Sequence, residues 1–134
     1  MNNATFFFNQ PKNEPVFSYA KGSKERELLS RELEKQYNQC IEIPIIINGK
    51  EIRTGNVSEV VMPTEHSHVL AKFHKADKET VQKAIEAALE ARKKWENVHW
   101  IDRCSIMLRA AEFLAGKYRY VINAATMLGQ GKNP

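Results

Sequence analysis

The 134-residue chain lacks the features that mark several classes of protein. Its two cysteines, Cys40 and Cys104, cannot build a disulfide framework, which favours a reducing compartment. Its longest apolar runs, such as residues 6–8 and 45–47, are far shorter than the roughly 20 residues that span a bilayer, so we expect no membrane partner. The first ten residues contain neither Arg nor Lys, and an arginine-rich mitochondrial presequence is therefore not visible.

Charge of a single sign is also lacking. The 20 basic and 16 acidic residues give a net charge of +4, and the two signs alternate along the chain, as in Lys78-Glu79. Nucleic-acid binding is more typical of a one-signed basic stripe with exposed aromatic residues, so we expect no nucleic-acid partner. The 43% hydrophobic content and the length are those of one globular domain.

The glycines form no standard phosphate-binding motif. No G-x-G-x-x-G is present, so the phosphate turn of a Rossmann fold is missing. The run Gly129-Gln130-Gly131-Lys132 resembles part of a Walker A loop, but Thr126 stands where that loop needs its first glycine. We interpret the run as the end of a helix, with Gly129 as the first residue after it.

The histidines and cysteines are the remaining candidates for chemistry. His66 and His68 would share one face of a strand, with His74 beyond them, but no cluster of Cys or carboxylates completes a metal site. We interpret them as solvated loop histidines, with zinc uptake as the test of a metal-binding alternative. Cys104 fits an apolar helical stripe and is predicted to be a small buried residue, while Cys40 has no base nearby in sequence. We therefore predict no catalytic, cofactor-binding or metal-binding residue.

The patterns predict an α+β chain with small antiparallel strands and three to four amphipathic helices. Residues 1–13 have no periodicity and are predicted to be a disordered tail, and residues 14–134 form the structured segment. Ser23 is predicted to cap a helix that ends near residue 39. Extended runs are predicted at 43–52, 57–62 and 68–74, and Asn48-Gly49 is the residue pair of a type I′ hairpin turn.

Three further helices follow in the second half of the chain. Asp77 is predicted to cap a helix to about residue 97, on which Val81, Ile85 and Leu89 share one face. The next helix begins at residue 99 or 100 and is interrupted at Gly116. Its predicted buried stripe consists of Cys104, Met107, Leu108, Ala111 and Leu114. A last helix runs to residue 129.

Several segments together resemble one enzyme family. They are residues 13–16 (Asn-Glu-Pro-Val), 22–26, 69–73, 76–78, 83–95, 102–103, 110–111 and 126–132. The alanine-rich helix that ends in Trp95, followed by Arg103 near the next helix start, resembles the aldehyde dehydrogenase superfamily. The Asn-Glu-Pro-Val and Gly-Gln-Gly-Lys motifs resemble its delta-1-pyrroline-5-carboxylate (glutamate semialdehyde) dehydrogenase branch.

The resemblance implies the amino-terminal portion of a large α/β enzyme with cofactor, catalytic and oligomerisation regions, in the mitochondrial matrix. It leaves open a homo-oligomer as the assembly, and the cytoplasm is the alternative compartment. That family oxidises glutamate semialdehyde to glutamate in proline catabolism with NAD, through a cysteine nucleophile and a glutamate-activated water. Neither Cys40 nor Cys104 matches the nucleophile's motif, and we expect the catalytic residues to lie beyond Pro134. We therefore predict a fragment or truncated isoform that is inactive alone. The alternative is a small α+β interaction module that docks on a partner, such as a full-length homologue, through Val81, Ile85 and Leu89.

Overall fold

The structure is a computed structural model that describes residue 10 and residues 12–134. Residues 1–9 and 11 of the predicted tail, which covers residues 1–13, lie outside the described residues. The rest contains one helix, then five short strands, then three helices, which confirms the predicted α+β class. In chain order the elements are α1 (Lys24–Tyr37), β1 (Ile41–Ile43), β2 (Ile45–Ile47), β3 (Lys50–Ile52), β4 (Val57–Met62), β5 (Glu65–His74), α2 (Lys78–Trp95), α3 (Trp100–Ala115) and α4 (Arg119–Gln130).

Local side-chain caps begin the first two helices. Ser23 Oγ accepts a hydrogen bond from the Arg26 amide at 3.3 Å. The Asp77 carboxylate accepts from both the amide and the hydroxyl of Thr80, each at 2.7 Å. These bonds satisfy amide groups that have no partner within the first turn of a helix. Both predicted caps are therefore confirmed.

The strands form two sheets, and one of their pairings is parallel, whereas the patterns predict small antiparallel strands. Strands β2 and β3 make a two-stranded hairpin, in which Asn48 and Gly49 both have positive φ, as a type I′ turn requires. Strands β1, β5 and β4 form the second sheet, and β1 runs parallel to β5. Pro44 separates β1 from β2, and because it has no amide hydrogen to donate, the chain leaves one ladder and enters another there.

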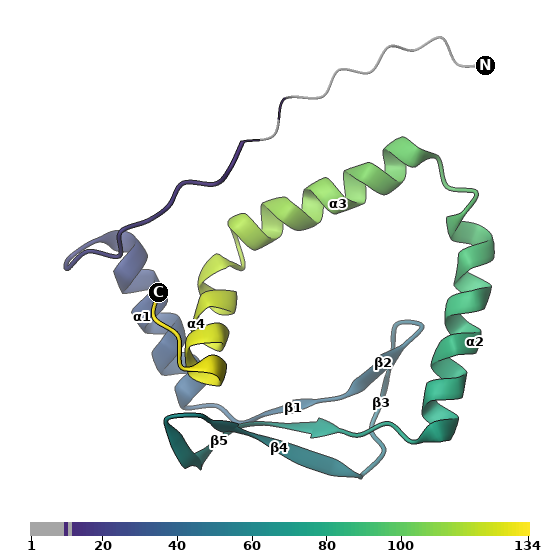
Figure 1. Cartoon of the computed structure of the whole chain (residues 1–134), viewed down its shortest axis with the longest axis horizontal. Coiled ribbons are helices and arrows are strands. Elements are labelled where there is room, and N and C mark those ends of the chain that lie inside the picture. The colour runs from purple at the N-terminus through teal and green to yellow at the C-terminus, as the bar shows by residue number, and fades with distance from the viewer. Residues whose placement is uncertain (1–9, 11) are drawn as a thin grey trace.

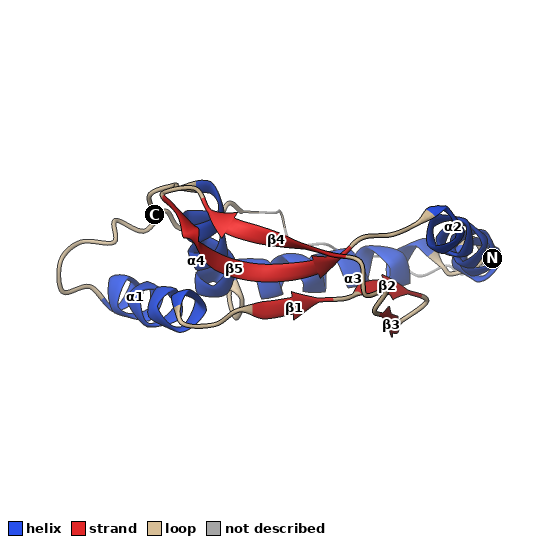
Figure 2. Ribbon diagram, turned by 90° about the horizontal axis from the view of Figure 1, so that it is seen from below, coloured by secondary structure: helices blue, strands red, loops and turns tan. Residues whose placement is uncertain are grey.

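The elements follow one another around an open ring. In Figure 1, α2 forms one side of the ring and α3 the next, and α4, α1 and the strands complete the circuit. Figure 2, from a perpendicular direction, shows that the ring is shallow. No helix in the described part of the chain is long and apolar enough to cross a lipid bilayer.

The small hydrophobic core lies where α1 contacts α4 and α4 contacts the sheet. Leu29 of α1, Ala71 of β5 and Ala124 of α4 are the hydrophobic residues that are buried within the described chain. A hydrogen bond of 2.9 Å from Gln36 Nε2 to the Val121 carbonyl joins the two helices. A core of this size is small for a chain of 134 residues, so most apolar side chains keep contact with solvent.

Candidate functional site: the apolar surface of α2 and α3

Helix α2 presents an apolar face that the described chain leaves half exposed. Val81, Ile85 and Leu89 lie four residues apart and therefore share one side of the helix. Their exposed fractions are 49%, 50% and 57%. This face is the one that the periodicity predicts for packing, and it is available to a partner.

Helix α3 is still more exposed. Of its residues only Ile101 and Arg103 are half-buried, and all the others are exposed. The prediction that Cys104, Met107, Leu108, Ala111 and Leu114 form a buried stripe is therefore wrong for this chain. The stripe exists, but no described element covers it. Trp95 and Trp100 are also exposed, at the adjoining ends of the two helices. The other large exposed apolar side chains of both helices, which we call the α2–α3 apolar surface, are Val81, Ile85, Leu89, Ile106, Met107, Leu108, Phe113 and Leu114.

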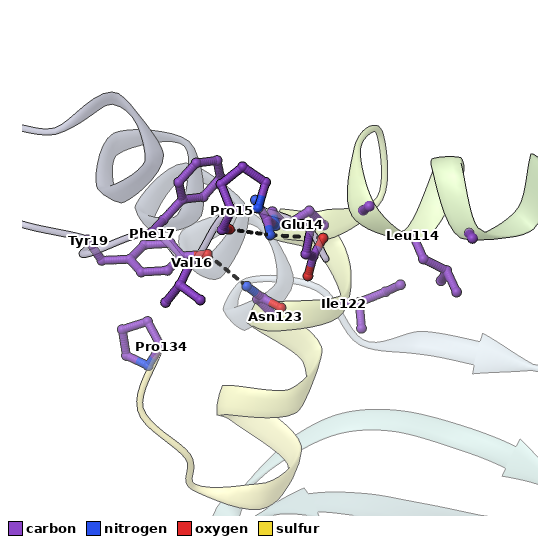
Figure 3. A pocket seen from close by; sticks show the side chains of 12 residues that line it. Glu14, Pro15, Val16, Phe17, Tyr19, Leu114, Ile122, Asn123 and Pro134 are labelled. Atoms are coloured by element: carbon purple, nitrogen blue, oxygen red, sulfur yellow. Dashed lines mark hydrogen bonds and ion pairs between the residues drawn. The ribbon is translucent and has the colours of Figure 1, made fainter. Parts of the chain in front are cut away.

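A cleft of about 650 Å³ lies between the segment before α1 and the junction of α3 with α4 (Figure 3). Arg119 crosses it, with one guanidinium nitrogen 2.9 Å from the Glu14 carboxylate and 3.2 Å from the Pro15 carbonyl. The same guanidinium lies 4.2 Å from the centre of the Phe17 ring. The charge of Arg119 is thus already paired with groups of this chain, so the cleft offers a solute mainly apolar contacts.

The three candidate histidines have separate partners. His68 is in β5, where its ring stacks on Tyr37 with centroids 4.1 Å apart and its Nε2 donates to the Tyr37 carbonyl at 2.9 Å. The Tyr37 hydroxyl donates to Glu65, and this hydrogen bond raises the pKa of Tyr37. His66 is exposed in the same strand. Within the described residues, no group of three metal-ligating side chains comes together.

His74 belongs to a polar cluster that the sequence did not indicate. Its side chain is only 4% exposed, and its Nε2 lies 2.6 Å from Glu42 Oε1. Its Nδ1 accepts a hydrogen bond from the Gly55 amide at 3.2 Å, so Nε2 carries the proton and donates to the carboxylate. This bond, helped by the charge of Arg53 and opposed by desolvation, holds the pKa of Glu42 below its usual value. His74 is therefore a buried structural side chain, not a solvated loop histidine.

The two cysteines and the glycine run at residues 129–132 are the remaining candidates from the sequence. Cys40 is exposed between α1 and β1, and Cys104 is exposed on α3, so the prediction of a buried Cys104 is wrong. Helix α4 runs through Gly129 and ends at Gln130. The residue after the helix is Gly131, whose φ of 64° is left-handed and whose amide donates to the Met127 carbonyl at 3.0 Å. The glycine run is thus a helix end, two residues later than predicted.

Known proteins resemble both the sequence and this geometry. Residues 51–134 match the model of the aldehyde dehydrogenase family. The chain is 48% identical over 131 residues to a delta-1-pyrroline-5-carboxylate dehydrogenase of Agaricus bisporus, covering 97% of this chain and 24% of that protein. It is 44% identical over 120 residues to the mitochondrial enzyme of that name from Homo sapiens, covering 90% of this chain and 21% of that protein.

A solved structure has the same arrangement of elements. The crystal structure of the delta-pyrroline-5-carboxylate dehydrogenase from Mycobacterium tuberculosis superposes with a TM-score of 0.91 at 37% identity. The match covers 96% of this chain and 24% of that one. The chain thus spans about a quarter of the length of the relatives that it matches. Because the family model covers more than half of its residues, the chain belongs to the aldehyde dehydrogenase family.

Proposed function

We propose that this chain is a structural segment of a delta-1-pyrroline-5-carboxylate dehydrogenase. The complete enzyme would oxidise glutamate semialdehyde, the open form of pyrroline-5-carboxylate, to glutamate with NAD in the mitochondrial matrix. The proposal rests on how much of each protein the match covers. The similarity extends over 97% of this chain but over only 24% of the Agaricus bisporus enzyme. Several relatives are named as mitochondrial enzymes, which supports the compartment.

NAD does not fit the residues of this chain alone. Dinucleotide binding of the standard kind needs a glycine-rich turn that leads from a parallel strand into a helix. The parallel strands here, β1 and β5, are connected through the short strands β2, β3 and β4. Among the described residues that line the cleft, Arg119 is the cation, and Glu14 already pairs with it, so little positive charge is left for a pyrophosphate. The Mycobacterium tuberculosis enzyme has been solved with NAD bound, which shows the cofactor for that protein.

We expect neither cysteine of this chain to act as a nucleophile. A catalytic thiol needs a base or a cationic group that favours the thiolate. Cys40 lies in the connection between α1 and β1, and Cys104 lies on a helix with neighbours that are mostly apolar. We therefore expect the isolated chain to have no dehydrogenase turnover.

The α2–α3 apolar surface supports a role as part of a larger enzyme. Burial of one large apolar side chain stabilises a protein by about 1.5–3 kcal/mol, so a half-exposed one has on the order of 1 kcal/mol still to contribute. Eight such side chains give on the order of 8 kcal/mol before the costs of association, which is comparable to the stability of a whole domain. A surface of this kind favours contact with a large apolar partner.

A complementation assay tests the proposal. The purified chain is incubated with NAD and pyrroline-5-carboxylate, alone and together with the part of the Agaricus bisporus enzyme that its match does not cover. We expect NADH formation only from the mixture. Turnover by the chain alone would overturn the claim of inactivity, and a mixture without association would overturn the assignment as a segment of that enzyme.

The second candidate function is a self-sufficient interaction module that docks on a partner such as a full-length homologue. The half exposure of Val81, Ile85 and Leu89 favours it, since a docking face must be accessible. A cooperative thermal transition of a monodisperse monomer, with binding to the intact relative, would support the module. A chain that aggregates until the complementary part is added would support the segment.

A further inference from the structure

Arg103 is a cationic side chain in an unusual position on α3. Its Nε is buried, and it has no hydrogen-bond partner among the described residues. It is one of only two half-buried residues on a helix that is otherwise exposed. The guanidinium therefore has a buried donor that no group in the described part of the chain satisfies.

An unsatisfied donor of this kind is costly. A guanidinium keeps its charge at any physiological pH and presents five N–H donors in a planar fork. A buried polar group without a partner costs about 1–3 kcal/mol, and more when it is charged. Native structures contain few such groups, and each requires an explanation, such as a partner that is not yet present.

The other partly buried arginine of the second half provides a comparison. Arg119, with a side chain 12% exposed, contacts both the Glu14 carboxylate and the Pro15 carbonyl through one guanidinium nitrogen. Arg103 has no equivalent acceptor in the described chain. Its sequence neighbour Asp102 makes no ion pair with it, because adjacent side chains on a helix diverge. The orphan donor is therefore specific to Arg103.

We propose that Arg103 is the polar anchor of the α2–α3 apolar surface and binds a carboxylate from the part of the dehydrogenase outside these 134 residues. The inference rests on the proposed function, which supplies the occupant: the relatives are about four times as long as their match to this chain. A carboxylate is the acceptor whose two oxygens match the guanidinium fork. Within an apolar contact, such a pair would fix the orientation of α3 as well as contribute to affinity.

Association with the complementary part of the Agaricus bisporus enzyme tests the inference. Titration calorimetry compares the wild-type chain with Arg103→Met, Arg103→Lys and the control Arg109→Met, which makes the same change at an exposed position of the same helix. We expect Arg103→Met to raise the dissociation constant about tenfold or more, and Arg109→Met to change it less than about twofold. Arg103→Lys should raise the dissociation constant nearly as much as Arg103→Met, because lysine keeps the charge but loses the planar guanidinium fork.

Two further measurements separate an interface role from a role in the fold of this chain. The affinity of the wild-type complex should fall more steeply with salt than that of Arg103→Met, because the variant has lost an ion pair. The helix content of the isolated Arg103→Met chain should match that of wild type, since the donor is unpartnered there. Equal affinities for the two methionine variants, or loss of helix in isolated Arg103→Met alone, would overturn the inference. If the wild-type chain did not bind the complementary part of the enzyme, both this inference and the proposed function would be overturned. The results with the variants test only the inference.

Discussion

Replacement of Ile85 and Leu89 by serine distinguishes packing within this chain from packing on a partner. Both side chains are about half exposed, so the area that each still has to bury is worth about 1 kcal/mol. Serine loses that contribution at both sites and adds hydroxyl groups whose burial without a partner costs about 1–3 kcal/mol each. The sum is at least about 4 kcal/mol, which weakens association with the complementary part of the enzyme about a thousandfold.

The assay is titration of the complementary part into the double variant, with helix content measured on the isolated chain. The matched control is Glu86→Ser with Glu90→Ser, which places the same changes at the same spacing on the same helix. The two double variants should have similar helix content, and only the Ile85 and Leu89 pair should weaken binding. If that pair unfolded the isolated chain while the control did not, the face would already be packed within this chain. Unchanged affinity would show that the contact lies elsewhere.

Three smaller changes test the internal contacts by thermal or urea unfolding. Leu29→Ala should cost about 2–5 kcal/mol, because the side chain is 3% exposed and is the largest buried hydrophobic one described; a cost below about 1 kcal/mol would contradict the packing of α1 on α4. Ser23→Ala should cost about 1 kcal/mol through loss of the cap, seen as reduced helix content, and Ser23→Asn should retain it. The pKa of Glu42 is lowered in the folded chain, chiefly by its hydrogen bond to His74, so its stabilising effect is complete above the ordinary pKa of glutamate and is lost as pH falls through the lowered value. The urea concentration at the midpoint of unfolding should therefore decrease as the pH is lowered through that acidic range. Glu42→Gln should reduce this part of the pH dependence, and an unchanged pH profile would contradict the pairing of Glu42 with His74.

Short sequence signals predicted the helix starts and the hairpin turn correctly. Ser23 and Asp77 each provide a side-chain acceptor at a helix start, and Asn48-Gly49 provides two residues that tolerate positive φ. These signals act within a few residues and need no knowledge of the rest of the fold. The glycine run was ambiguous because Gly129 and Gly131 can both end a helix, and the structure uses the second.

The parts that the sequence could not predict depend on distant groups. The parallel pairing of β1 with β5 joins residues about 30 positions apart, such as Ile41 and Ala71. The contact of His74 with Glu42 depends on that pairing. An apolar stripe shows which side of a helix seeks burial, but not whether its partner belongs to the same chain. This is why the stripe that contains Cys104 was predicted to be buried and is exposed.

The contact between α1 and α4 has a consequence for how the chain folds. Gln36 and Val121, which join the two helices, are 85 residues apart in sequence. Closing a flexible loop of that length costs about 4 kcal/mol of chain entropy, and the small core has little to offset it. The hairpins and single helices should therefore form early, and closure of the ring should be the slow step. A partner that held α2 and α3 in place would shorten the effective loop and speed closure of the ring.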